Sequence, residues 1–284
     1  MKTQDDLLHL HSKRRRFIAV TGGKGGTGKS TVAVNLAATY ARQGARVLLV
    51  DADLGMADLN LLLGVAPNRS IFDLLHGRPF ESVLSKTHGV YLLPSLNGSY
   101  QLANLEHSVR ARFLSLIEKA CTEFDTVIID TAAGLGANSI DFAAMADEVV
   151  LVTSSAPASL ADTYACLKVL SNYKGLERAY ILPNAVSSEA EGQVVFSQLA
   201  SLSERFLLSL SLQSLPAILF DTEVNIAAAN GVPMVFYKPE ANVSRALRRV
   251  AHRLDMLATS NFSQPKLRSY LNQTGEFAQE VQVP

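Results

Sequence analysis

The sequence predicts an α/β fold with a doubly wound, mostly parallel sheet flanked by helices. Six short runs rich in Val and Ile are hydrophobic almost without interruption, which is typical of strands covered on both faces. Longer stretches of helical character separate them, and right-handed crossovers then place helices on both sides of the sheet. The expected strands are Arg16–Thr21, Arg46–Asp51, Gly89–Pro94, Thr126–Asp130, Glu148–Thr153 and Ala179–Val186.

Composition indicates a folded protein of the reducing cytoplasm. Of the 284 residues, 48% are hydrophobic and 18% charged, enough for a sizeable core. Lys plus Arg equals Asp plus Glu, 26 against 26, so no global field attracts nucleic acid. We interpret Cys121 and Cys166 as small core residues of predicted helices. No apolar run is long enough to span a membrane, and the polar start is unlike a signal peptide. We therefore expect a cytoplasmic protein that touches a membrane at most reversibly.

Three segments divide the chain. Residues 1–15 form a polar N-terminal extension, residues 16–258 the folded domain, and residues 259–284 a polar C-terminal tail. Within the domain, the first helix is expected over Gly28–Gln43, because Gly44 suits the position after a helix end.

The glycine-rich segment after the first strand matches a phosphate-binding loop. Gly23–Ser30 read GKGGTGKS, between a predicted strand and a predicted helix. Backbone N–H groups of such a loop surround phosphate oxygens, while Lys29 lies along the β- and γ-phosphates and Ser30 binds Mg²⁺. A glycine-rich turn with incidental lysines is the alternative. The expected nucleotide contacts are Gly23, Lys24, Gly25, Gly26, Thr27, Gly28, Lys29, Ser30 and Thr31.

Acidic side chains end two other strands. Asp51 and Asp53 follow one run and Asp130 another, so a parallel sheet brings them to the phosphate loop. We expect Asp53 to orient the attacking water and Asp130 to lie on the metal side, with Ser30, Asp53 and Asp130 as candidate Mg²⁺ ligands. Asp51 either joins them or caps a loop. The small residues Thr131–Gly136 suit a segment that senses the γ-phosphate.

The segment KGGTGKST resembles the deviant phosphate loop of the MinD/ParA group of P-loop ATPases, whose signature is an additional lysine. This resemblance implies a homodimer that closes on two ATP molecules with Mg²⁺. Lys29 then serves its own nucleotide, and Lys24 crosses to the neighbour's, where a cation stabilises transition-state charge. Lys24, Lys29 and Asp53 are the implied catalytic residues. The alternative for Lys24 is a solvated loop residue.

Further segments resemble one branch of that group, the FlhG/FleN regulators of flagellar number and placement. DADLGMADLNLLLG is similar to the first switch and DTAAGLG to the second, while Ala156–Leu170 and Glu191–Leu207 are similar to FlhG/FleN segments. The resemblance covers about residues 16 to 258. It implies a protein partner, either a flagellar regulator or an FlhF-like GTPase. Asn184 matches the asparagine that reads adenine, although a turn-forming asparagine is also possible.

Three departures from the family pattern bear on these contacts. Asp58 and Asn60 stand exchanged in the first switch, and Leu219 replaces a usual proline near the base. The N-terminal TQDDLLH is at best a degraded form of the segment that stimulates the partner GTPase. In the tail, Leu267, Tyr270, Leu271 and Phe277 could form a small membrane-binding face beside Lys266 and Arg268.

The segment VSRALRRVAHRLDML is predicted to be a helix with a buried apolar stripe and a basic face. A solvated face is favoured over a phosphate-binding patch, so nonspecific DNA is a secondary expectation. The basic residues are Arg245, Arg248, Arg249, His252 and Arg253.

The sequence thus predicts a switch ATPase with slow, Mg²⁺-dependent hydrolysis and an FlhG/FleN-like role. The alternatives are a MinD- or ParA-like positioning ATPase acting on membrane or nucleoid, and a metabolic P-loop enzyme. Iron–sulfur carriers of the wider group are disfavoured, because a shared cluster needs paired cysteines such as Cys-x-x-Cys.

Overall fold

A computed structural model describes residues 16–95, 106–120 and 122–259, and it contains a nine-stranded sheet. The strands are β1 (Arg16–Thr21), β2 (Val47–Ala52), β3 (Ser85–Thr87), β4 (Val90–Leu93), β5 (Thr126–Thr131), β6 (Glu148–Thr153), β7 (Arg178–Val186), β8 (Ser211–Ser214) and β9 (Ile218–Leu219). Their order is β3-β4-β2-β5-β1-β6-β7-β8, with β9 paired to β7. Within this described sheet, the β3–β4 pair is antiparallel and the other pairs are parallel.

The hydrophobic runs formed strands as predicted, because the sheet is covered on both faces. Each residue of β2, β5 and β6 is buried. The sequence did not predict β3, β8 or β9. Strands β3 and β8 read SKT and SLQS and lack such runs, whereas β9 consists of two residues, Ile218–Leu219.

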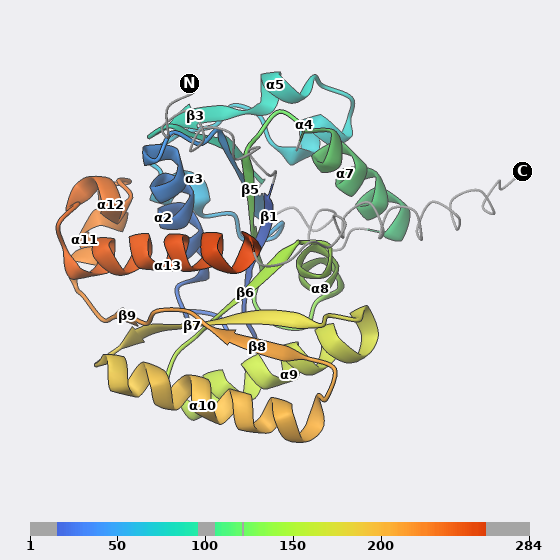
Figure 1. The fold of residues 1–284 in the computed structure, drawn as a ribbon. Helices are drawn as coiled ribbons and strands as arrows, with labels where there is room; N and C mark the ends of the chain where they lie inside the picture. Colours follow the sequence, from blue (N-terminus) through green and yellow to red (C-terminus); the bar gives the residue numbers. More distant parts are fainter. Residues whose placement is uncertain (1–15, 96–105, 121, 260–284) are drawn as a thin grey trace, which may run out of the picture.

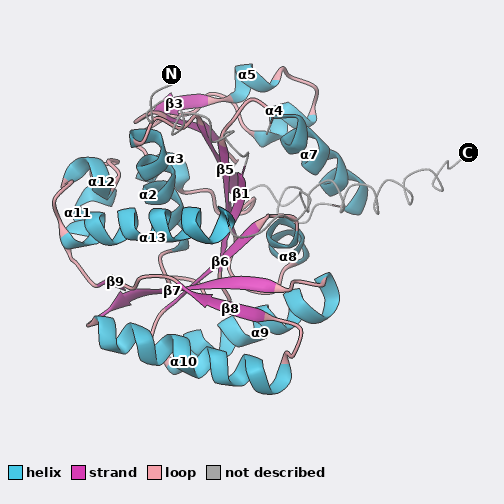
Figure 2. Ribbon diagram, in the orientation of Figure 1, coloured by secondary structure: helices cyan, strands magenta, loops and turns pink. Residues whose placement is uncertain are grey.

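Helices cover both faces of the sheet (Figures 1 and 2). One layer contains α2 (Lys29–Arg42), α3 (Leu59–Leu62), α11 (Glu223–Ala229), α12 (Met234–Tyr237) and α13 (Asn242–Thr259). The other contains α4 (Ile71–Leu75), α5 (Phe80–Val83), α7 (His107–Ala120), α8 (Ala137–Ala144), α9 (Pro157–Lys174) and α10 (Glu189–Phe206). Alternating strand residues feed two hydrophobic clusters: Ile18 and Val20 join the first layer, whereas Phe17 and Ala19 join the second. The sheet is therefore a rigid platform whose strand ends can hold a site.

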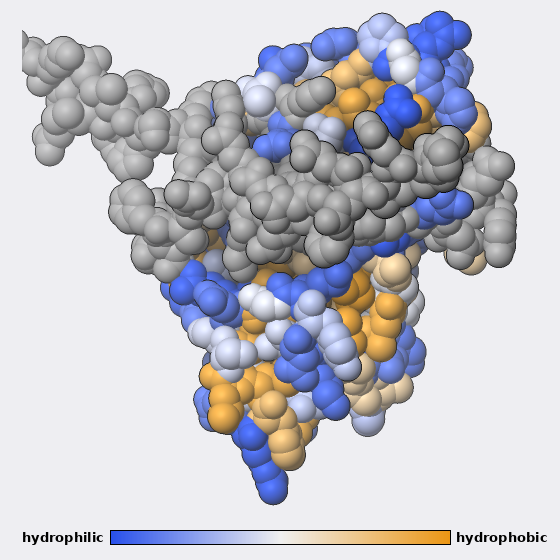
Figure 3. Space-filling view, turned by 90° about the vertical axis from the view of Figure 1, so that its right-hand side faces the viewer, coloured by the Kyte–Doolittle hydropathy of each residue, from blue (hydrophilic) through white to orange (hydrophobic). Residues whose placement is uncertain are grey.

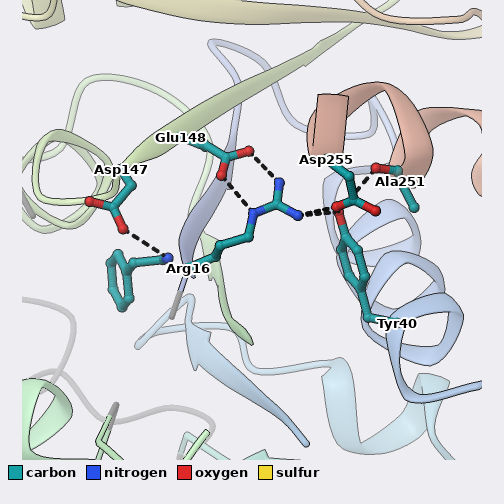
Figure 4. Close-up of polar contacts among 7 residues, drawn as sticks. Arg16, Tyr40, Asp147, Glu148, Ala251 and Asp255 are labelled. Carbon is teal, nitrogen blue, oxygen red and sulfur yellow. Dashed lines mark hydrogen bonds and ion pairs between the residues drawn. The ribbon is translucent and has the colours of Figure 1, made fainter. Parts of the chain in front are cut away.

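Arg16, the first residue of β1, is the centre of a buried polar cluster at the amino end of that strand (Figure 4). Its guanidinium group donates to both carboxylate oxygens of Glu148 in β6, at 2.8 and 2.6 Å. It also donates to the Tyr40 hydroxyl of α2 at 3.0 Å and forms an ion pair with Asp255 of α13. Burial lowers the pKa of Arg16, but the hydrogen-bonded Glu148 carboxylate outweighs this with the other partners and the pKa is raised overall. The cluster thus fastens two helices to the sheet through satisfied charges.

Two glycines hold the segment after α3 against the turn after α11. Gly64 and Gly231 both have positive φ angles, 64° and 63°. A Cβ atom on Gly231 would lie 2.5 Å from the Gly64 Cα, and one on Gly64 would lie 2.8 Å from the Gly231 carbonyl oxygen. Any larger residue would push the two backbones apart.

The surface mixes polar and apolar side chains. In Figure 3, hydrophobic and hydrophilic surface alternate over the face shown. The exposed large hydrophobic side chains include Tyr173 of α9 and Leu202 and Phe206 of α10. Cys166 is buried in α9, as expected for a core residue, whereas Cys121 lies outside the described residues. Among the described helices, none combines the length and hydrophobicity needed to cross a bilayer. The N-terminal extension and the tail from residue 260 onward also lie outside the described residues.

Candidate nucleotide site

The glycine-rich loop and the acidic residues meet at the carboxyl ends of three adjacent strands, β2, β5 and β1. The loop connects β1 to α2, and Asp51 and Asp130 lie opposite each other in the parallel β2–β5 register. The sheet therefore brings together the loop and the carboxylates that the sequence predicted to converge.

The loop is tightly packed at two of its glycines. A Cβ atom on Gly23 would lie 2.0 Å from the backbone carbonyl oxygen of Asp162 in α9. Gly28 caps the start of α2 with φ = 86°, and a Cβ atom there would lie 2.4 Å from the Asn184 amide nitrogen. These positions tolerate no side chain, so the loop backbone is held with its N–H groups at the helix start, where phosphate groups bind in such loops.

The two lysines differ in their surroundings. Lys29 is buried, and its ammonium group donates to the Lys24 carbonyl oxygen at 3.3 Å, so its charge lies over the loop. The Lys24 side chain is exposed to solvent. The Lys29 ammonium group therefore lies where it can bind a phosphate held by its own loop, whereas the Lys24 side chain is free to contact a group outside the loop.

Asp130 is a buried carboxylate without a protein donor. It is 0% exposed, and neither of its oxygens accepts a hydrogen bond from the described part of the chain. Burial raises the pKa of Asp130 to about 7, while the nearby Ser30 hydroxyl and the Lys29 charge act in the opposite direction. Burial, followed by the negative charge of Asp130, raises the pKa of Asp51 well above its ordinary value. Two such neighbouring carboxylates need a cation to be stable in ionised form.

Asp58 is a site residue that the sequence reasoning treated only as an exchanged position. One of its carboxylate oxygens, Oδ1, is buried and has no partner among the described residues. Its pKa is raised by burial and lowered by the Ser30 hydroxyl. Asp58 therefore shares the surroundings of Ser30 and Asp130. The acidic side chain at position 58, within the predicted first switch, is the sequence feature that could have identified it as a site residue.

The loop after β2 orders the remaining carboxylates. The Asp51 carboxylate accepts from the Asp53 backbone N–H at 3.3 Å, and the Asp53 carboxylate accepts from the Met56 N–H at 3.2 Å. Asp51 thus caps a loop and also lies opposite Asp130 in the sheet. Asp53 is half-buried and holds a fixed turn.

The donor set fits Mg²⁺, which prefers hard oxygen ligands. The buried, partnerless oxygens of Asp130 beside the Ser30 hydroxyl provide this chemistry without a competing protein donor. Ser30 and Asp130 are the residues that would hold the ion, and Asp53 follows the adjacent strand.

A cavity of about 230 Å³ opens beside the loop. Asn184, at the end of β7, lines it and donates its amide N–H to the Thr27 carbonyl oxygen at 2.8 Å. This bond uses one amide N–H and fixes the orientation of the amide group, so that the Asn184 carbonyl oxygen remains available to accept from a bound base. Leu219 and Phe220 of the segment containing β9 also line the cavity, and Phe220 is exposed. Both the asparagine and the departure at Leu219 thus belong to the pocket.

The predicted second switch also reaches the loop. The Gly134 backbone N–H donates to the Gly22 carbonyl oxygen at 3.1 Å, and the Thr131 and Thr21 hydroxyl groups lie 2.8 Å apart. The segment after β5 is thereby connected to the loop on which phosphate groups would sit.

Comparisons with known proteins agree with this geometry. A family model described as the CobQ/CobB/MinD/ParA nucleotide binding domain matches residues 18–234. The antiactivator FleN of Pseudomonas aeruginosa is 36% identical over 84% of this chain and 86% of its own. The flagellum site-determining protein YlxH of Helicobacter pylori is 32% identical over 72% of this chain and 69% of its own.

Solved structures extend the likeness to the fold. The septum site-determining protein MinD of Pyrococcus horikoshii, complexed with Mg-ADP, matches with a TM-score of 0.70 and 27% identity, covering 86% of this chain and 97% of that one. A ParA family ATPase of Chlorobium tepidum matches with a TM-score of 0.71 over 86% and 100% of the two chains at 21% identity, which supports the fold alone.

Proposed function

The chain belongs to the CobQ/CobB/MinD/ParA family of nucleotide-binding proteins, and on this premise we propose that it is an ATP-dependent switch in the control of flagellar number or placement. The switch binds ATP and Mg²⁺, closes as a homodimer that presents a surface to a partner, and reopens after slow hydrolysis. The observation that carries the proposal is Asp130, a fully buried carboxylate beside a complete phosphate loop, whose oxygens accept no hydrogen bond from the residues that the structure describes.

The roles follow from the positions of the side chains. Lys29 binds the phosphates of its own nucleotide, and Asp53 orients the attacking water. Lys24, which is exposed, reaches the nucleotide of the partner subunit. Ser30 and Asp130, with Asp53 nearby, would hold Mg²⁺, which when bound neutralises the phosphate charge. The Asn184 carbonyl oxygen accepts from the adenine amino group.

The homodimer is further supported by apolar side chains beside the loop. Met56, after β2, and Leu135, after β5, are 78% and 51% exposed. Large apolar groups in both switch segments favour burial against another surface, and a second copy would place Lys24 at the neighbouring nucleotide.

The mass of the protein in solution tests this scheme. With ADP we expect the monomer of 30.6 kDa, and with ATP plus Asp53→Ala a trapped dimer of twice that mass. Lys24→Ala should keep nucleotide binding and lower ATP turnover by about a thousandfold, because a cation acting across an interface contributes at least that much. Lys86→Ala, another exposed lysine, is the matched control and should leave turnover unchanged. The scheme fails if every sample stays monomeric.

The flagellar role is supported by the similarity of the chain to the antiactivator FleN and to the flagellum site-determining protein YlxH. It predicts that deleting the gene in its own host changes the number or position of flagella, and that a flagellar regulator or an FlhF-like GTPase is retained by the ATP-bound protein. Normal flagella in the deletion strain would exclude this role while leaving the ATPase switch intact.

A MinD- or ParA-like positioning role is the second candidate, because septum site-determining MinD of Synechocystis is 30% identical over 84% of this chain. It predicts ATP-dependent sedimentation with liposomes that is lost on deleting residues 259–284, or salt-sensitive retention on DNA. A protein of this kind acts in the cytoplasm with reversible membrane contact. If only a dialysable small molecule stimulates ATP turnover, a metabolic enzyme is favoured instead.

A further inference from the structure

A second hollow lies on α13, on the side away from the nucleotide cavity. It has a volume of about 560 Å³ and is strongly basic. Its lining consists of Pro216, Arg245, Arg248, Arg249, His252 and Arg253.

Helical spacing creates this surface. Leu247, Val250 and Leu254 are buried against the sheet, so the residues between them project outward. The acidic residue at this end of the helix, Asp255, is directed to Arg16 and Tyr40 instead of the hollow. The hollow therefore gathers cations from one helix face.

The positive charge in the hollow is only partly neutralised. Arg249 pairs with Glu189 at 3.0 Å. Arg248 donates to the Pro239 carbonyl oxygen at 2.7 Å, a contact that leaves its charge uncompensated. Within the described part of the chain, the Arg253 guanidinium group has no hydrogen bond or ion pair. Guanidinium groups held in this way present forked donors to an incoming anion.

The dimensions favour a short acidic peptide over a nucleic acid. From Arg245 to Arg253 the helix rises about 12 Å, a length that about four extended residues cover. A DNA duplex needs a longer basic track, and the chain as a whole has a net charge of zero. The His252 imidazole is the single aromatic ring among the lining residues, whereas a single-stranded nucleic acid is bound by stacking successive bases on several rings.

We propose that this arginine-lined hollow docks an acidic segment of a protein partner, with side-chain carboxylates paired to Arg245, Arg248, Arg249 and Arg253. The proposal does not depend on ATP hydrolysis. Val243 and Leu247 of α13 line the nucleotide cavity, whereas the arginines face the other way, so the peptide and the nucleotide do not compete.

The test measures binding of a fluorescent peptide of eight glutamates to the full chain by anisotropy. Arg253→Glu and Arg245→Glu should each weaken binding at least tenfold, and added salt should weaken binding to the wild-type protein. Arg253→Gln, which removes the charge without reversing it, should give an intermediate loss. Arg78→Glu makes the same charge change at an exposed site away from α13 and should change the affinity less than twofold.

Two further probes separate the outcomes, namely a 20-base-pair duplex and phosphatidylcholine vesicles containing phosphatidylglycerol. Binding of either probe but not of the peptide, with dependence on Arg253, would assign the hollow to phosphate groups and overturn the proposal. Equal losses in the Arg78 and Arg253 variants would overturn it as well. Both variants should still bind ATP, so failure here is distinct from failure of the nucleotide switch.

Discussion

The two ends of the adjacent strands β1 and β5 carry buried charges with opposite surroundings. At the amino end, Arg16 meets Glu148, Tyr40 and Asp255, and each buried charge has a partner (Figure 4). At the carboxyl end, beside Val20 of β1, the fully buried Asp130 of β5 accepts no hydrogen bond on either oxygen from the described part of the chain. One pair of strands thus links a satisfied cluster to an unsatisfied one.

The presence or absence of a protein partner distinguishes charges that stabilise the fold from charges that can bind a ligand. A satisfied cluster holds elements together, and removing one partner leaves the other buried and unpaired. An unsatisfied carboxylate costs stability in the free chain and gains its partner when a cation binds. Substitutions at the two ends should therefore change stability in opposite directions.

The largest effect on stability is expected at the satisfied end. Arg16→Met should lower the free energy of unfolding by about 3–5 kcal/mol, because Glu148 remains buried without its cation. Urea denaturation measures the change. Arg78→Met, at an exposed arginine, is the control and should shift it by less than about 0.5 kcal/mol. Similar shifts in both variants would contradict the structural role of the cluster.

At Asp130, the change in the free energy of unfolding should have the opposite sign. Asp130→Asn should raise the free energy of unfolding of the nucleotide-free protein by about 1–2 kcal/mol at pH 8, because it removes a buried, unpaired charge beside Asp51. Nucleotide with Mg²⁺ should stabilise the variant less than it stabilises the wild type. A destabilised variant would show that Asp130 already has a partner in the free chain.

The raised pKa of Asp130 predicts that the stability of the protein depends on pH. Burial raises the pKa of Asp130 from its ordinary value of 3.8 to about 7. Between these values the folded chain retains a proton that the unfolded chain has lost, so stability should fall as the pH rises through this window, by at most about 1.4 kcal/mol per pH unit. Urea denaturation at a series of pH values should show this slope in the wild type and a flatter one in Asp130→Asn.

The smallest effect on stability is expected at Tyr40, and it compares the contribution of a hydroxyl group with that of the ion pair in the same cluster. Tyr40→Phe removes the hydroxyl that donates to Asp255 at 3.1 Å and accepts from Arg16 at 3.0 Å, but it leaves the Arg16–Glu148 pair. The expected loss is about 0.5–1.5 kcal/mol, because a neutral hydroxyl is lost while Arg16 keeps both carboxylate partners. Thermal unfolding measures it, and a loss as large as that of Arg16→Met would mean that the hydroxyl, not the ion pair, holds the cluster.

Sequence reasoning succeeded where the determinants are local. The buried strands follow from continuous apolar runs, and β1 and β6 have the predicted bounds. The loop over Gly23–Ser30 lies where its spacing placed it, because glycine and lysine act there through neighbouring backbone groups. The family and the sheet class were predicted from the same local signals.

The remainder depends on residues that are distant in the chain. Arg16 lies 132 positions from Glu148 and 239 from Asp255, so no spacing pattern could reveal their cluster. The amide of Asn184 is oriented by Thr27, 157 positions away. Strand β8 escaped prediction because an edge strand needs no continuous apolar run.

The contact between Gly64 and Gly231 determines how the first switch can respond to a ligand. Its downstream end is pinned to the α11–α12 turn, and its upstream end is continuous with β2. A rearrangement would pivot within residues 53–58, a hinge that carries Asp53, Met56 and Asp58 together. Asp53, which we propose orients the attacking water, and the exposed side chain of Met56 would then move together, so that a change at the phosphate would also move the surface that we propose a second subunit contacts.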